Sequence, residues 1–446
     1  MRSSSLPLAL TIAAATAFVR LAAADDVVPQ GPLIETGTLR PSGAARQPRL
    51  CSWREPICVH GDVAPGALLR VLASAERAWE VETGPLALPA PDADPVTGAY
   101  DIYVSIAVPE ETLTAVGSRD PRSRVDRASA FTLLDASLAL GGSCRMDTAI
   151  ASAVARAALF RASPATDEGS ARAEAEYFAR LAVPCAMSAP AGIDVFQSSP
   201  ERAVMDPRVG DPRSAAEFDR GASLFYWWLD ASFGGQPGGL VRALWALSAT
   251  KTPPDAERWK GQPDGVDVLR ESFKDALSEG SRLEDVLAEF GATRALLGRR
   301  ENGAELREAR TLGEAIAPRI DWEIDWPAAP RRLASSVGLS PTGSAYILVR
   351  RAGAPPGTRL RLEATWEQHA AIRWTAVKLD AGGHELGRIP IAADPRATEA
   401  QATLVNLDEA AAILIVATNV GDPFIRLDPD DEVFEPHGWL VTLARE

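Results

Sequence analysis

Histidine is scarce in this sequence. It occurs only as His60, His369, His384 and His437. No two of these residues have the spacing that zinc ligands show on a helix or a hairpin, where imidazoles stand a few residues apart. We therefore expect each histidine to be a surface or loop residue, and we expect no metal and no other cofactor.

Positive charge is also in short supply. The chain has 46 lysines and arginines against 60 aspartates and glutamates, which gives a formal net charge of -14. Lysine occurs only at positions 251, 260, 274 and 378. Phosphate binding requires concentrated positive charge, so this balance excludes nucleic acid from the expected partners.

Long apolar runs are absent after the first residues, and no later stretch approaches the roughly 20 apolar residues that cross a bilayer. The opening MRSSSLPLALTIAAATAFVRLAAADD has a basic start, an apolar run and small residues at Ala22-Ala23-Ala24. This pattern predicts a cleaved secretory signal over residues 1–24, although Arg20 interrupts the apolar run. Without Arg2 and Arg20, 44 basic residues would face 60 acidic ones, a net charge of -16. We expect a soluble secreted or periplasmic protein.

Cysteine is limited to Cys51, Cys58, Cys144 and Cys185. An even number in an exported chain favours disulfides over metal thiolates, and neither neighbouring pair has the CxxC spacing of a zinc site. Three connectivities are open to four cysteines. We expect the pairing that is local in sequence, Cys51 with Cys58 and Cys144 with Cys185.

The residue pattern changes twice along the chain. Residues 25–50 are rich in Pro, Gly and Arg without periodicity, which predicts a flexible leader. Residues 51–318 combine a few strand patterns with a long block of helical period, so we expect an α+β domain that is mostly helical. Residues 319–446 contain short β-type runs separated by Gly, Pro, Asp and Asn, which predict an all-β antiparallel sandwich.

Three stretches of the α+β part share a pattern with one family. LLRVLASAERAWEVETGPLALPAPDADPVTGAYDIYV resembles the opening helix and strand of secreted zinc metallopeptidases of the gluzincin kind. EFDRGASLFYWWLDASFGG is similar to the helix that follows their active site, and SRLEDVLAEFGATRALLG to the helix that closes the domain. The resemblance covers roughly residues 58–300 and implies a metallopeptidase-like domain.

The resemblance also implies that DTAIASAVARAALFRA, residues 147–162, occupies the place of the HExxH helix. That motif sets two imidazoles one turn apart on one helix face to hold zinc, with a glutamate as general base. In the best register Ser152 and Arg156 stand where the histidines would be, and Ala153 where the base would be. The motif is therefore degenerate at all three positions.

The next helix of the family supplies a third ligand, usually a glutamate. Glu168, Glu174 and Glu176 all lie near that place, and we choose Glu174 as its equivalent. A salt bridge from Arg156 to one of these carboxylates would replace the metal by an ion pair. The alternative, which the sequence leaves open, is that Arg156 reaches solvent.

Other chemistry has weaker support. A Ser/His/Asp triad has no GxSxG motif to anchor it, and a glycosidase carboxylate pair is unsupported in an acidic chain with many candidates. The aromatic stretch at 225–228 is expected in the core. The acidic stretch Asp428, Asp430, Asp431, Glu432 and Glu435 could bind Ca²⁺, but a solvated turn is the preferred interpretation.

We therefore expect a metallopeptidase-like protein without its zinc motif that binds and does not catalyse. Its partner would be a protein, a peptide or an envelope polymer, with no nucleic acid and no membrane span. Two alternatives remain: an active hydrolase with unorthodox residues in the same cleft, and a structural envelope or extracellular protein that interacts through its sandwich.

Overall fold

The structure is a computed structural model of the 446-residue chain. It describes residues 31–42, 46–106, 108, 111–141, 144–188, 192–205, 212–276, 283–298, 312, 316–394, 396–422, 427 and 435–446. The expected signal segment lies outside this part of the chain.

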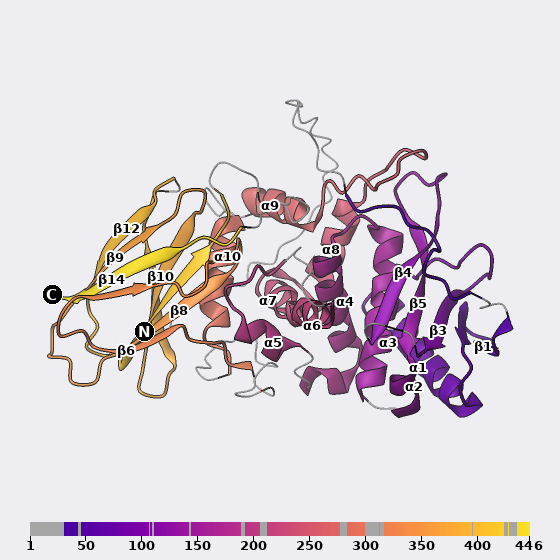
Figure 1. Ribbon diagram of the computed structural model, residues 1–446, viewed down its shortest axis with the longest axis horizontal. Helices are drawn as coiled ribbons and strands as arrows, with labels where there is room; N and C mark the ends of the chain where they lie inside the picture. Colours follow the sequence, from indigo (N-terminus) through magenta and orange to yellow (C-terminus); the bar gives the residue numbers. More distant parts are fainter. Residues whose placement is uncertain are drawn as a thin grey trace.

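A mixed sheet with three helices forms one end of the molecule (Figure 1). Its elements are β1 (Arg49–Cys51), β2 (Ile57–His60), α1 (Pro65–Thr83), β3 (Tyr100–Ser105), β4 (Thr112–Arg119), β5 (Ala128–Asp135), α2 (Ala136–Gly141) and α3 (Cys144–Ala162). The strand order is β1-β2-β3-β5-β4. The pairs β2 with β3 and β3 with β5 are parallel, whereas β1 and β4 are antiparallel edge strands. Helices α1 and α3 cover one face, where Ile102 of β3 shares a core with Val71 and Ile150.

Local signals set the ends of the helices in this part of the chain. Pro65 lies in the first turn of α1, where its missing N–H is not needed, and the helix stops at Gly84, whose N–H still donates to Glu80 O at 3.1 Å. At the start of the helix that begins at Glu168, the side chain of Asp167 accepts a 2.9 Å hydrogen bond from the N–H of Ser170. This N-cap satisfies one of the backbone donors that every helix start leaves free.

Helices fill the middle of the molecule, between the mixed sheet and the C-terminal strands (Figure 1). They are α4 (Glu168–Ala182), the 3₁₀ turn η2 (Pro184–Ser188), α5 (Ile193–Ser198), α6 (Pro212–Gly221), α7 (Ser223–Phe233), α8 (Gly239–Ser248), α9 (Gly265–Ala276) and α10 (Leu283–Arg294). Aromatic rings form much of their common core: Phe225 and Trp228 of α7 lie 5.0 Å and 5.3 Å from Phe290 of α10, measured between ring centroids. The aromatic stretch of α7 is thus buried in the core, where its large apolar area stabilises the packing.

The C-terminal part is a β-sandwich. Its strands are β6 (Trp322–Asp325), β7 (Arg331–Ala334), β8 (Ser344–Arg350), β9 (Leu360–Trp366), β10 (Ile372–Leu379), β11 (Glu385–Ile391), β12 (Glu399–Leu404), β13 (Ala412–Asn419) and β14 (Trp439–Arg445). One sheet has the order β11-β10-β13-β8-β6 and the other β12-β9-β14-β7. Burial alternates along β9, so that Leu362 and Ala364 point into the core shared by the two sheets. The expected all-antiparallel pairing is wrong at one place, because β6 runs parallel to β8 at the edge of its sheet.

The sandwich is joined to the helices through α10. Ala292 on this helix packs against Tyr346, Leu348 and Leu414 on the outer face of the larger sheet. The approach is so close that a Cβ on Gly291 would lie 2.3 Å from Thr418 Oγ1. Apolar side chains therefore cover both faces of this sheet, so that α10 belongs to the packing of the sandwich although it precedes residue 319.

Both disulfides have the expected local pairing, Cys51–Cys58 and Cys144–Cys185. The first joins β1 to β2, and the second joins the start of α3 to η2. Part of the segment expected to be a flexible leader is bonded to the body of the protein: Ile34 N–H donates to Glu257 O, and Gly37 N–H donates to Val116 O, both at 3.0 Å. In the described residues, no helix is both long and apolar enough to cross a membrane.

Candidate functional site

Two neighbouring pockets, which share Arg220, lie where the edge strand β4 meets the helices, and together we call them the groove. Strand β4 forms one wall, and α3, α4 and α6 form the others. The lining residues are Glu111, Thr112, Leu113, Thr114, Asp135, Ser137, Leu138, Arg145, Ser152, Ala153, Arg156, Glu168, Arg172, Ala175, Ala216, Glu217 and Arg220. Polar and charged side chains predominate in this set, so the groove is suited to a polar ligand.

Ser152, Ala153 and Arg156 all lie in this groove, on the face of α3 that is turned toward β4. Arg156 is 7% exposed, and its guanidinium lies 4.8 Å from the centroid of the Phe160 ring. The same guanidinium forms an ion pair with Glu168 at the start of α4. Of the two readings left open by the sequence, the structure shows the ion pair, and it identifies Glu168 as the partner.

Glu174 lies elsewhere on α4, because it is six residues from Glu168 and points to another side of the helix. Its side chain is 1% exposed and accepts a 2.7 Å hydrogen bond from the indole N–H of Trp245 on α8. Burial raises the pKa of Glu174 to about 8, which the bond from Trp245 only partly offsets. The four positions named from the sequence thus do not converge: three line the groove, and Glu174 is held in the helical core.

The charges in the groove are paired with one another. Glu168 bridges Arg156 and Arg172, with 2.9 Å from Arg172 Nε to its carboxylate. At the other end, Glu111 bridges Arg145 and Arg220, with 3.0 Å to Arg220 Nη1. Each carboxylate thus lies between two guanidiniums that a ligand carboxylate could also reach.

Strand β4 presents free backbone groups to this groove. The carbonyl of Val116 accepts its hydrogen bond from Gly37, on the side away from β5. Since backbone groups alternate sides along a strand, the N–H and C=O of Thr114 and Thr112 face the same outer side. Among the described residues, no backbone hydrogen bond to these outward groups is found. Within the described part of the chain, the first half of β4 is therefore an open sheet edge.

A chain of hydroxyl groups holds this edge against α3. Thr114 Oγ1 lies 2.7 Å from Thr132 Oγ1 on β5, which lies 2.6 Å from the hydroxyl of Tyr100 on β3. That hydroxyl donates in turn to the carbonyl of Ala153 at 3.2 Å. The groove wall and the α3 helix are therefore connected by directed bonds, which keep the groove geometry fixed.

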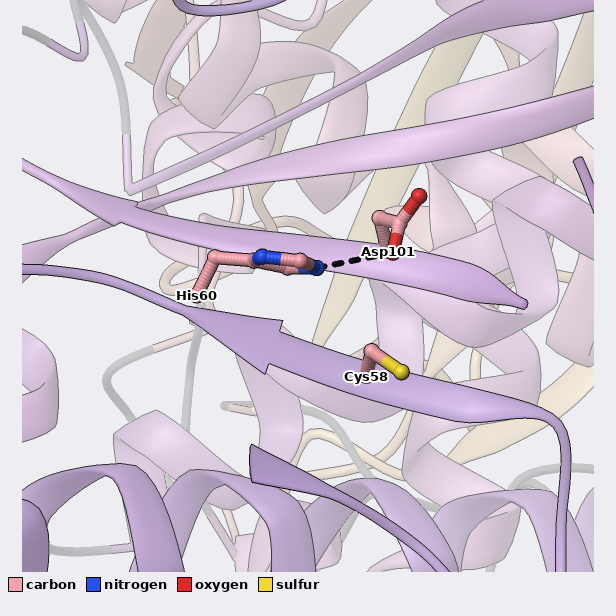
Figure 2. Close-up of side chains that lie close together, drawn as sticks. All are labelled: Cys58, His60 and Asp101. Carbon is pink, nitrogen blue, oxygen red and sulfur yellow. Dashed lines mark hydrogen bonds and ion pairs between the residues drawn. The ribbon is translucent and has the colours of Figure 1, made fainter. Parts of the chain in front are cut away.

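A second cluster, which the sequence pattern did not reveal, lies on β2 and β3. Figure 2 shows Cys58, His60 and Asp101, with one ligand atom of each within 4.8 Å of the others. His60 Nε2 lies 2.8 Å from Asp101 Oδ1, and the imidazole stacks on the Tyr103 ring at 4.7 Å between centroids. The expectation that His60 is a surface or loop residue is wrong, because it is 5% exposed and in a strand.

The spacing of residues 58 and 60 was the available signal for this cluster, since residues two apart in a strand share a face. Recognising it required the register of β2 on β3, which is a tertiary contact. In the structure Cys58 is bonded to Cys51, so its sulfur is not a thiolate ligand.

The other sequence candidates do not add to a site. His369 and His384 are exposed and bonded to Asp422 and Asp380, and His437 lies 3.5 Å from Glu367. Of the acidic stretch proposed for Ca²⁺, only Glu435 is described, and the remaining residues lie outside the described part of the chain.

Comparison with known proteins gives little further information. No family model and no curated protein matches the sequence. Among solved structures, the pre-peptidase C-terminal domain of collagenase from Bacillus anthracis matches 29% of this chain and 97% of its own, with 5% identity and a TM-score of 0.19. The VP2 subviral particle of infectious bursal disease virus matches 26% of this chain and 32% of its own, with 14% identity and a TM-score of 0.17. The likenesses are too weak to carry an argument, and the resemblance to gluzincins remains a prediction from the sequence.

Proposed function

We propose that this chain is a non-catalytic binding protein of metallopeptidase-like design, which holds an extended polypeptide along the outer edge of β4. The observation that carries the proposal is the open edge at Thr112 and Thr114, which lies on the wall of the groove. An extended peptide could add to this edge as a further strand, with main-chain hydrogen bonds that do not depend on its sequence.

The residues of α3 support binding without catalysis. Ala153 has no group that could act as a general base, and Arg156 carries a permanent positive charge where a metallopeptidase would place a neutral imidazole ligand. Arg156 is held in place by Glu168 and Phe160, so its charge is part of the packed structure. This proposal keeps the expected exported location and requires no cofactor.

The bridged arginines suggest how the ligand would be oriented. Glu168 is half exposed, with 55% of its side chain accessible, whereas Arg156 beneath it is buried. A carboxylate of the ligand, such as the C-terminus of a peptide, could displace Glu168 and take up both guanidiniums. A ligand that supplies both an extended main chain and a carboxylate is a polypeptide.

The test uses the outward direction of the Thr114 N–H. Thr114→Pro removes this donor from the open edge and leaves the ladder to β5 intact, because the lost N–H faces away from β5. Thr114→Ala is the matched control, since it removes the same hydroxyl but keeps the N–H. The probe is unfolded casein labelled with fluorescein, and binding is followed by fluorescence anisotropy.

Both variants lose the hydroxyl group that contacts Thr132, so we expect Thr114→Pro to bind casein at least about tenfold more weakly than Thr114→Ala, the equivalent of one or two lost hydrogen bonds. No casein fragments should appear during the measurement. Equal affinity of the two variants, no binding by the wild type, or cleavage of casein would each overturn the proposal.

A further inference from the structure

The disulfide-linked cluster at the far side of the mixed sheet carries an inference that is independent of the groove. Cys58 and His60 are two residues apart on β2, and Asp101 is the register partner of Cys58 on the parallel strand β3. All three side chains therefore project from the same face of the sheet. Figure 2 shows the three side chains close together, with the bond between His60 and Asp101.

This cluster has the chemistry of a metal site with one ligand blocked. Cys58, His60 and Asp101 are 7%, 5% and 0% exposed, and a ligand atom of each lies within 4.8 Å of the other two. The carboxylate of Asp101 is held in its orientation by Thr97, whose hydroxyl donates a 2.7 Å hydrogen bond to the second carboxylate oxygen. His60 Nε2 lies 2.8 Å from Asp101 Oδ1, so this nitrogen and the carboxylate face one another across the point where an ion would lie.

The blocked ligand is the sulfur of Cys58, which is bonded to Cys51. Cys51 lies on the short edge strand β1 and is exposed, whereas Cys58 is buried. An attacking thiolate would thus meet the sulfur of Cys51 first, and the sulfur of Cys58 would leave. Reduction would free the sulfur of Cys58 as a ligand beside the imidazole of His60 and the carboxylate of Asp101.

We propose that reduction of the Cys51–Cys58 disulfide opens a zinc site formed by Cys58, His60 and Asp101. A dithiol reductant supplies the two electrons and two protons: one of its thiolates attacks Cys51 Sγ, the disulfide breaks, and Cys58 leaves as a thiolate. The second thiol of the reductant then displaces Cys51, which becomes a thiol, and the reductant ends as a disulfide.

The resulting donor set is one sulfur, one nitrogen and one oxygen. Zn²⁺ accepts all three donor types and favours a tetrahedron, so a water molecule would complete the coordination. Binding keeps Cys58 deprotonated, and its proton is released to solvent. Three protein ligands leave one coordination position open to that water, and the three protein ligands are buried in the oxidised protein.

The test uses Cys51→Ser in the full chain. This variant leaves Cys58 as a free thiol without any reductant, so the Cys144–Cys185 disulfide stays intact. Co²⁺ is the probe, because a tetrahedral cobalt site with a thiolate ligand has intense visible and near-ultraviolet absorption that an octahedral aqueous ion lacks. Zn²⁺ is then added to displace it. Cys58→Ser is the matched control, since it frees a thiol at the exposed position 51.

We expect Cys51→Ser to bind one Co²⁺ with the tetrahedral thiolate spectrum, and the oxidised wild type and Cys58→Ser not to show it. Adding His60→Gln or Asp101→Asn to Cys51→Ser should weaken binding by at least about tenfold. The wild type should gain the spectrum on treatment with a dithiol and lose it on reoxidation.

Thermal unfolding of each variant shows whether it is folded before its cobalt binding is measured. A folded Cys51→Ser variant that binds no cobalt overturns the proposal. It is also overturned if Cys58→Ser shows the same spectrum, or if binding is unchanged by His60→Gln and by Asp101→Asn.

Discussion

Arg156 on α3 and Glu168 on α4 form an ion pair in which the two partners are buried to very different extents, with 9% and 55% of their side chains exposed. Loss of Glu168 leaves a buried guanidinium without this partner, whereas loss of Arg156 leaves a half-exposed carboxylate that keeps Arg172 at 2.9 Å. The cost of breaking the pair should therefore depend on which partner is removed.

We predict that Glu168→Gln lowers the free energy of unfolding by about 1–2 kcal/mol, and that Arg156→Met lowers it by less, since methionine keeps the apolar contact with Phe160 and buries no charge. Urea unfolding of the two variants and the wild type measures the difference. A larger loss in Arg156→Met would contradict this account of the pair.

Stability should depend on pH through Glu174. Its pKa rises from an ordinary value of 4.5 to about 8 in the folded protein, because its carboxyl group is buried. The folded state therefore holds this proton more tightly than the unfolded state. Its contribution to stability is fully present below pH 4.5 and is lost as the pH rises toward 8.

Glu174→Gln keeps the acceptor for Trp245 and removes the titration. We predict that this variant melts a few degrees higher than the wild type at pH 8 and at the same temperature as the wild type or lower near pH 4.5. Calorimetry across this range, with the exposed Glu80→Gln as control, gives the comparison. A constant difference between Glu174→Gln and wild type at all pH values would argue against the raised pKa.

A zinc site grafted onto α3 should use Glu168. The triple variant Ser152→His, Ala153→Glu and Arg156→His places two imidazoles one turn apart on the face of α3 that lines the groove. The carboxylate of Glu168 already reaches the side chain at position 156, whereas Glu174 is bonded to Trp245.

We therefore predict that the triple variant binds zinc in calorimetric titrations and that the oxidised wild type does not. Adding Glu168→Gln should weaken this binding by about 10 to 100-fold, and adding Glu174→Gln should leave it unchanged. If Glu174→Gln were the change that removed binding, the ligand assignment made from the sequence would be restored. A triple variant that binds no zinc would remove the support for a metallopeptidase ancestor.

The two disulfides should differ in their contribution to stability. Cys144 and Cys185 are 41 residues apart, and Cys51 and Cys58 are 7 apart. From the loss of chain entropy in the unfolded state, the longer loop should contribute about 4 kcal/mol and the shorter about 2 kcal/mol. Replacing each pair with serines and comparing urea midpoints tests this order, and an equal loss from both pairs would contradict it.

Gly291 should resist a change that normally stabilises helices. Ala has a higher helix propensity than Gly, but a Cβ at position 291 would lie 2.3 Å from Thr418 Oγ1 and 2.7 Å from Ser344 Oγ. We predict that Gly291→Ala lowers the free energy of unfolding by about 1–3 kcal/mol through overpacking. Gly66→Ala in α1 is the control, since its Cβ would meet only Arg70 Nη1 at 3.9 Å, and it should be neutral or stabilising. Equal effects of the two substitutions in thermal unfolding would show that α10 can move away from the sandwich.

The sequence by itself predicted the features that depend on neighbouring residues. Helical period and the signals at Pro65 and Asp167 mark α1 and α4, short alternating runs mark the strands of the sandwich, and the spacing of the cysteines favoured the disulfides that form. These signals are local because they arise from backbone geometry and from side chains a few positions apart.

The tertiary structure decided which distant residues meet. The sequence offered three carboxylates for Arg156, and only the packing of α4 on α3 selects Glu168. The sequence assigned Glu174 to the degenerate metal site, whereas α4 turns that side chain toward Trp245. It treated His60 as a surface residue, because the register that sets β2 beside Asp101 on β3 is not encoded in any short stretch. Contacts between elements depend on how whole faces pack, and that free energy is shared among many residues, so no single motif reports it.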